Sequence, residues 1–67
     1  MYISTSSFKV GDKVRNTRIL KSLGGHFEIN TPLTIIDVDS MRGYSVADEF
    51  GNKITECGWD GFKKDKE

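Results

Sequence analysis

The stretch from Leu33 to Cys57 constrains the fold most, because it contains three candidate β-strands joined by two turns. Its first run, Leu33–Val38, is dense in β-branched residues, which favour strands. Ser40–Gly43 marks the first turn, Tyr44–Asp48 the next strand, and Glu49–Asn52 the second turn. Consecutive strands joined by short turns pair with their neighbours, so the stretch predicts an antiparallel meander within an all-β fold.

The second turn leaves two registers open for its hairpin. A two-residue loop, Gly51-Asn52, would place Val46 opposite Cys57. A three-residue loop, Glu49–Gly51, would place Val46 opposite Ile54. We favour the second register because it puts two apolar residues on one face. A shift of one residue turns every side chain of a strand to the other face, so in this register an unbent strand points Cys57 away from the core, and a bend in the strand is the alternative that would return it.

Alternation along the first run of the meander divides its side chains between the two faces of the strand. One face carries Thr34, Ile36 and Val38, and the other carries Leu33, Ile35 and Asp37. Asp37 and Asp39 predict that the second face turns toward solvent near the end of the strand, because carboxylates are rarely buried.

The residues before the meander predict one strand and one long loop. Gly11-Asp12 indicates a tight turn or a bulge, and the first strand follows over Lys13–Thr17. Residues 18–31 predict a hairpin-like loop with its tip near Gly24-Gly25, because a glycine pair opposes a long helix. Pro32 begins the next strand, at a position where its missing N–H is tolerated.

Both ends of the chain are expected to be less ordered than its centre. Residues 1–7 predict a flexible N-terminus, with a short edge strand as the alternative. Near the other end, Trp59 and Phe62 have the i, i+3 spacing that a single 3₁₀ turn brings to one side. We expect this turn to cap the open end of the fold, and residues 63–67 to form a frayed charged tail.

A chain of 67 residues forms one domain, and a domain of this size has a small core. Ten Lys and Arg residues balance ten Asp and Glu residues, which argues against a protein whose main task is to neutralise phosphates. Cys57 is the only cysteine, so no internal disulfide forms, as in proteins of a reducing cytoplasm. No segment has roughly 20 consecutive apolar residues. We therefore expect a cytoplasmic monomer without a membrane contact.

Four motifs resemble those of SH3-like small β-barrels, a group that includes the KOW type. They are FKVGDKV (Phe8–Val14), TIIDV (Thr34–Val38), GYSV (Gly43–Val46) and DEFGN (Asp48–Asn52). The chain is also similar to short proteins of Gram-positive bacteria and their phages. The resemblance covers residues 8–62. It implies a five-stranded SH3-like small barrel with a long loop after the first strand, and with a short 3₁₀ turn and a short final strand near the C-terminus.

No constellation of residues predicts catalysis. A cysteine nucleophile needs a neighbouring base, and His26, the only histidine, belongs to a loop distant from Cys57. One histidine and one cysteine do not make the ligand set of a zinc site. The acidic candidates for acid–base chemistry or calcium binding fit a solvated strand face better; they are Asp37, Asp39, Asp48 and Glu49. We therefore expect no enzymatic activity, no metal and no cofactor.

Binding is the function that the sequence favours, and a protein is the expected partner. In an SH3-like barrel the long loop and the first turn of the meander flank one groove, which implies a site between residues 18–31, residues 39–43 and Trp59. The residues expected to form it are Arg18, His26, Phe27, Arg42, Tyr44 and Trp59. In the alternative interpretation, Phe27, Tyr44 and Trp59 belong to the core and its cap. The small size of the core favours that alternative.

Nucleic acid is the alternative partner. Basic side chains of the long loop and of the first meander turn would form a patch, and aromatic rings would stack on bases. The patch residues are Arg15, Arg18, Lys21 and Arg42. The neutral net charge makes this the second hypothesis, because a basic field supplies most of the affinity of such proteins.

Overall fold

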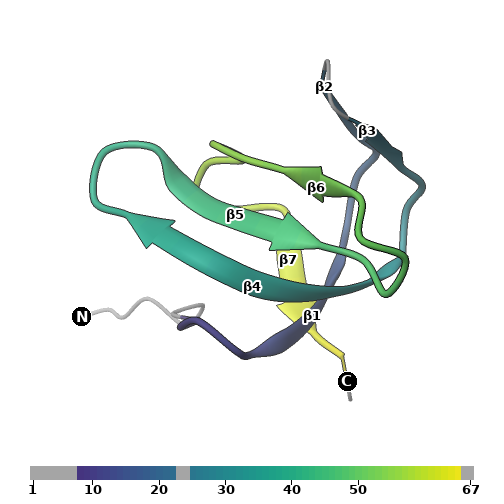
Figure 1. The fold of residues 1–67 in the computed structure, drawn as a ribbon, viewed down its shortest axis with the longest axis horizontal. Helices are drawn as coiled ribbons and strands as arrows, with labels where there is room; N and C mark the ends of the chain where they lie inside the picture. Colours follow the sequence, from purple (N-terminus) through teal and green to yellow (C-terminus); the bar gives the residue numbers. More distant parts are fainter. Residues whose placement is uncertain (1–7, 23–24, 66–67) are drawn as a thin grey trace.

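The computed structural model describes residues 8–22 and 25–65. These residues contain seven β-strands and no helix. The strands are β1 (Lys13–Asn16), β2 (Leu20–Ser22), β3 (Gly25–Phe27), β4 (Pro32–Asp39), β5 (Gly43–Ala47), β6 (Lys53–Ile54) and β7 (Phe62–Lys64). Five of them form one sheet in the order β6-β5-β4-β1-β7, and β2 and β3 form a separate two-stranded sheet (Figure 1). The predicted all-β class and the antiparallel meander β4-β5-β6 are confirmed.

Three short stretches lie outside the described residues: 1–7, 23–24 and 66–67. The expected flexible N-terminus and the tip of the hairpin-like loop fall in the first two. The described chain begins at Phe8, whose N–H donates a hydrogen bond to the hydroxyl of Tyr44 (3.0 Å). In the part of the chain that the structure describes, no helix has the length and apolar character needed to cross a membrane.

The residues before the meander fold as one strand followed by a hairpin, as predicted. Gly11 has a positive φ of 98°, the conformation that a tight turn at this position requires. β1 then pairs with β4 and places Lys13 opposite Thr34. Within the long loop, β2 pairs with β3 and places Leu20 opposite Phe27. The long loop is therefore a small sheet of its own.

A β-bulge in β4 overturns the predicted faces of that strand. The register with β5 shifts between Ile35 and Asp37, which makes Ile36 the extra residue. Directly paired residues share a face, so Val38, which is opposite Tyr44, lies on the core side. Asp37 consequently lies on the outer side and is exposed. The expectation that Asp37 turns toward solvent is confirmed, but its placement on the same face as Leu33 and Ile35 is wrong because it assumed an unbroken alternation.

The hairpin between β5 and β6 has the register that we favoured. Val46 is opposite Ile54, and Gly51 has the positive φ (93°) that the three-residue loop requires. Asp48 holds the loop, because its carboxylate accepts hydrogen bonds from the backbone N–H and the side-chain amide of Asn52 (2.9 Å each). The glycine and the aspartate that specify this register are both visible in the sequence.

The last strand of the meander ends earlier than predicted. β6 stops at Ile54, and Glu56 adopts a positive φ of 59°. The chain then returns to β5, where the N–H of Cys57 donates to the carbonyl of Tyr44 (2.8 Å). This break in the alternation turns Cys57 toward the core cluster, on which it packs. The orientation expected of an unbent strand is therefore wrong, and the alternative of a bent strand is the one that the structure shows.

The C-terminal segment forms the short final strand that the resemblance implies, but this strand includes residues expected in a frayed tail, and the expected 3₁₀ turn does not precede it. Residues 59–61 form bends instead of a 3₁₀ turn, and the carbonyl of Gly61 accepts the N–H of Thr17 (2.7 Å). β7 pairs with β1, and beyond it the N–H of Asp65 donates to the carbonyl of Lys13 (3.2 Å). The edge of β1 that does not pair with β4 supplies the hydrogen-bond partners of β7, so strand pairing extends into the expected tail.

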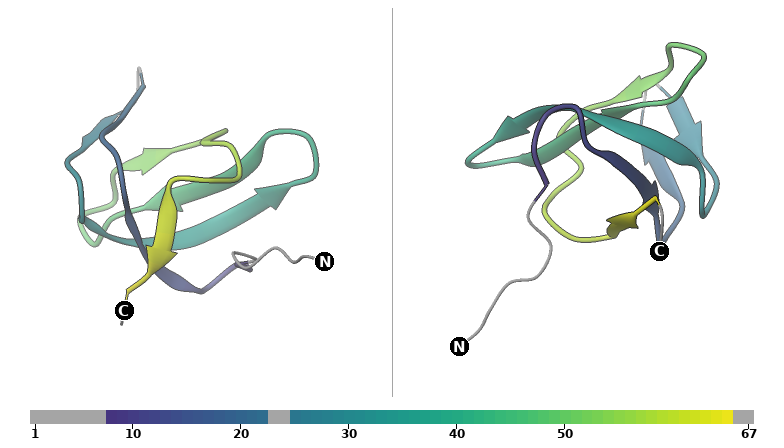
Figure 2. Two further views of the ribbon diagram at one scale, coloured as in Figure 1. Left: turned by 180° about the vertical axis from the view of Figure 1, so that it is seen from behind. Right: turned by 90° about the horizontal axis from the view of Figure 1, so that it is seen from below.

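The five-stranded sheet is curled, and the β2–β3 hairpin stands beside it (Figure 2), with one buried cluster of apolar side chains shared by the two sheets. Every strand contributes to the buried apolar residues, which are Val14, Leu20, Phe27, Leu33, Ile35, Tyr44, Val46, Ile54 and Phe62. Burying each of the aliphatic and phenyl side chains contributes about 1.5–3 kcal/mol. The five-stranded sheet is open, because its edge strands β6 and β7 do not pair with each other over the described residues.

Candidate functional site

A groove of about 280 Å³ separates the β2–β3 hairpin from the end of the meander. Its first wall is residues 18–22, which include β2, and its second wall is residues 54–57, which continue from β6. Both strands are edges of their sheets. Leu20 and Ile54 are buried beneath the groove, and Ile19 is 48% exposed beside it. Two sheet edges with apolar side chains between them form a surface suited to an extended peptide.

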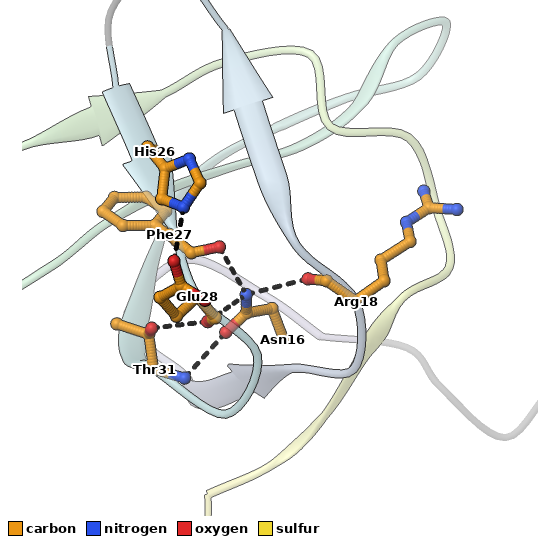
Figure 3. A network of polar contacts seen from close by, with 6 residues as sticks. All are labelled: Asn16, Arg18, His26, Phe27, Glu28 and Thr31. Carbon is orange, nitrogen blue, oxygen red and sulfur yellow. Dashed lines mark hydrogen bonds and ion pairs between the residues drawn. The ribbon is translucent and has the colours of Figure 1, made fainter.

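Asn16, at the end of β1, positions the first wall (Figure 3). Its side chain is fully buried, and its Nδ2 donates to the carbonyl oxygens of Arg18 (2.9 Å), Phe27 (3.3 Å) and Glu28 (2.7 Å). Its Oδ1 accepts the N–H of Thr31 (2.8 Å). One side chain thus satisfies backbone groups before and after the hairpin, which holds the hairpin against the sheet.

Two glycines position the second wall. Gly43 has a positive φ of 87°, and a Cβ added to it would overlap the carbonyl group of Gly58. Around this contact, the N–H of Gly58 donates to the carbonyl of Arg42 (3.0 Å), and the N–H of Tyr44 donates to the carbonyl of Gly58 (2.9 Å). Only a glycine at position 43 allows this approach, so the path of residues 54–58 depends on it.

Tyr44 is the centre of an aromatic cluster beside the second wall. Its ring meets those of Phe8, Trp59 and Phe62 edge to face, with centroids 5.7, 5.1 and 5.9 Å away. Tyr44 and Phe27 are only 2% and 3% exposed, so both are core residues, as the alternative assignment of the aromatics expected. Trp59 is 47% exposed and is the member of that predicted set with surface left for a partner.

The three arginines of the predicted basic patch each form an ion pair. The pairs are Arg15–Asp65 (2.5 Å), Arg18–Asp60 (3.5 Å) and Arg42–Glu56 (3.0 Å). Exposed pairs of this kind contribute little to stability, but each carboxylate offsets the positive charge beside it. Lys21 forms no ion pair with any described residue, so it carries the uncompensated charge of this set.

The structure places two of the four predicted patch residues in the groove and a third beside its second wall. Arg18 and Lys21 line it, and Arg42 reaches it through its pair with Glu56, which also lines it. Arg15 lies on β1, outside the residues that line the groove. The groove therefore combines part of the expected basic patch with the expected long loop.

Cys57 lies in the second wall as a half-buried thiol. Burial raises the pKa of this thiol, and the positive charge of Arg18 opposes the shift only in part. The Sγ also donates a hydrogen bond to the carbonyl of Ile54 (3.5 Å). A thiol that stays protonated at neutral pH is a poor nucleophile, so Cys57 acts in the groove as a packing residue.

His26, expected at the binding site, lies on the hairpin and outside the residues that line the groove. Its Nε2 is 2.7 Å from Oε2 of Glu28, and both side chains are exposed. Its partner across the hairpin is Lys21. Over residues 8–22 and 25–65, no three His, Cys, Asp or Glu side chains gather as a metal site requires.

Two of the acidic candidates cap turns of the meander. Hydrogen bonds from the backbone N–H groups of Met41 (2.8 Å) and Arg42 (3.1 Å) lower the pKa of the Asp39 carboxyl. The side-chain amide of Asn52, followed by backbone N–H groups, lowers the pKa of the Asp48 carboxyl. Hydrogen bonds to the ionised form cause both shifts. These carboxylates therefore have a structural role in their turns.

Sequence reasoning missed the residues that shape the groove. Gly43 and Gly58 both match turn signals, but their contact joins two segments that no local pattern connects. One feature of the sequence could have identified Asn16. It follows the inward-facing Val14 by two residues, so the alternation of a strand places its polar side chain on the buried face. A buried amide must find hydrogen-bond partners, and here the backbone of the long loop supplies them.

Comparing the chain with protein-family models, with curated proteins and with solved structures, we found no match in any of the three. The groove itself is therefore the feature that bears on function. Its elements are two sheet edges, apolar side chains between them and Lys21, which forms no ion pair with any residue in the described part of the chain.

Proposed function

We propose that the protein is a non-catalytic interaction module that binds a segment of a protein partner in the groove between residues 18–22 and residues 54–57. One observation carries the proposal: two open sheet edges flank a groove of about 280 Å³ above buried apolar side chains. Domains that capture peptides use such edges for main-chain contacts and the pockets between them for side chains. The exposed surface of Ile19 supplies a further apolar contact.

We also propose that the fold is an SH3-like small barrel. The strand order supports this assignment, because a first strand and a long loop precede a three-strand meander, and the last strand returns to pair with the first. In this assignment the β2–β3 hairpin belongs to the long loop. One wall of the groove then comes from the long loop, as the resemblance implies, and the other wall comes from the end of the meander.

Nucleic acid is the weaker candidate as a partner. The arginines that would contact phosphates already have carboxylate partners, so a phosphate would have to replace an existing ion pair at each position. The affinity of nucleic-acid-binding proteins depends largely on the number of phosphates that they neutralise. Lys21 forms no ion pair with a described residue, so within that part of the chain it offers its charge without such an exchange.

Site-specific photo-crosslinking tests the proposed site. A photoreactive amino acid in place of Ile19 is expected to crosslink the partner in the cells that make the protein. The control carries it at Val10, which is 61% exposed and outside the groove. Ile19→Glu should abolish the complex, because a carboxylate beside the groove would have to be desolvated on binding, and Val10→Glu should leave it intact.

Two outcomes would contradict the proposal. Equal crosslinking from both positions, or a complex that survives Ile19→Glu, would place the site elsewhere. Retardation of DNA or RNA in a gel at low salt, lost in Lys21→Glu and on addition of salt, would favour the nucleic-acid assignment instead.

A further inference from the structure

We infer that the partner enters the groove as an extended strand that carries a carboxylate, and that it pairs with the open edge of β2 and with the backbone at residues 55–56. This inference rests on the proposed function and specifies the class of ligand. It follows from the backbone groups of the two walls and from the charge between them.

The first wall offers backbone groups along β2. β2 pairs with β3 on one side only, and the two strands form a sheet without further members among the described residues. Alternate residues of a strand direct their N–H and C=O groups to opposite edges. Within Leu20–Ser22, at least one residue therefore directs both groups away from β3 and toward the side of the groove.

The second wall offers backbone groups where β6 ends. Ladder pairing with β5 stops at Ile54, and hydrogen bonding to β5 resumes at Cys57. Thr55 and Glu56 lie between these points, and no backbone hydrogen bond joins either of them to another described segment. An inserted strand would supply the missing partners, because unpaired backbone groups at a sheet edge favour the addition of a strand.

The charge of the groove selects an acidic residue in the partner. Glu56 is engaged by Arg42 (3.0 Å), and Arg18 has Asp60 nearby (3.5 Å), which leaves Lys21 without a carboxylate among the described residues. A carboxylate on the partner would complete this set. The buried Leu20 and Ile54 beneath the groove favour apolar side chains at the alternate positions of the same strand.

A second copy of this chain fits the groove poorly. If two copies paired antiparallel through β2 and centred on Lys21, the two lysines would lie directly opposite each other. Like charges in that position destabilise a strand pair. The ligand that the groove favours is therefore a strand of another protein, with apolar residues alternating with Asp or Glu.

Peptide selection tests this inference. Displayed random peptides of about ten residues, enough to cross the groove when extended, would be selected on the native protein and counter-selected on Ile19→Glu. The expected peptides alternate apolar residues with Asp or Glu. Bound to the ¹⁵N-labelled protein, they should slow amide exchange at residues 20–22 and 55–56 by about tenfold or more. N-methylation of one alternate set of peptide amides should abolish this protection, whereas methylation of the other set should not.

The charge requirement has its own matched pair of variants. Lys21→Glu should weaken the binding of a selected acidic peptide about threefold or more, because it removes one ion pair and adds a like charge. Lys63→Glu changes the charge of an exposed lysine on β7 and should leave the binding unchanged. Equal effects of the two variants would show that only the net charge of the protein matters, and the inferred carboxylate contact would be wrong.

The outcomes separate the inference from the proposed function. Proline-rich peptides that shift the resonances of residues 18–22 and 54–57 without new amide protection would overturn the inferred strand and leave the module assignment in place. Peptides that perturb another face, or enrichment no greater on the native protein than on Ile19→Glu, would overturn both.

Discussion

The meander, residues 32–54, and the two segments that wrap it, residues 17–31 and 55–61, are held in different ways. In the meander, each strand pairs with its neighbour in sequence, and Asp39 and Asp48 hold the two turns. Few ladder pairs join the wrapping segments to the main sheet, and individual hydrogen bonds hold them against it instead. Stability is therefore distributed along the meander, whereas the walls of the groove depend on very few residues.

The largest effect is expected from Gly43→Ala, which places a methyl group where the carbonyl of Gly58 lies and strains a positive φ. We expect the free energy of unfolding to fall by about 4 kcal/mol, the sum of overpacking and backbone strain. Urea unfolding followed by the fluorescence of Trp59 measures it. Gly51→Ala has a similar φ but open space around the new Cβ, so it should cost only about 1 kcal/mol. Equal costs would show that the contact between the two glycines does not hold the second wall.

Asn16→Ala should have the next largest effect, because it leaves backbone groups of the long loop without their partner. We expect a loss of about 3 kcal/mol, with amide exchange accelerating more at residues 20–22 than at Val46 in the meander. Asn52→Ala, which removes one exposed side-chain hydrogen bond, is the control and should cost about 0.5 kcal/mol. Uniform acceleration of exchange across both regions would mean that Asn16 supports the whole fold rather than the hairpin.

The same division explains how much of the structure could be predicted from the sequence. The meander and its register were predictable, because Gly51 and Asp48 act within a few residues of the strands that they align. The bulge at Ile36 was not, since a run of β-branched residues looks alike with or without an extra residue. The contacts of Asn16 escaped prediction because their partners follow from how distant segments pack. The same holds for the walls of the groove.

A smaller effect is expected in the alkylation rate of Cys57, which compares the opening of the second wall with that of the meander. Because burial raises the pKa of this thiol, the thiolate should form, and labelling accelerate, at a higher pH than for a free cysteine. At neutral pH labelling should be slow but still faster than global unfolding, since the second wall opens more easily than the meander. Mass spectrometry of the labelled protein in increasing urea measures both rates. Labelling only at the rate of global unfolding would show that residues 55–61 are as firmly held as the strands.

The smallest effect concerns the turn caps of the meander. Hydrogen bonds lower the carboxyl pKa values of Asp39 and Asp48 below the ordinary 3.8, so their stabilising contribution is complete above that value and is lost as the pH falls through the lower folded-state values. The urea midpoint should therefore decline below about pH 4, and Asp48→Asn, which lacks the titrating carboxyl, should show a shallower decline. Asp37→Asn is the matched control, because that exposed side chain caps no turn among the described residues, and its profile should follow the native one. If both variants flattened the profile equally, general charge repulsion rather than local capping would govern the acid sensitivity. The meander would then owe its stability to strand pairing alone, without a measurable contribution from its turns.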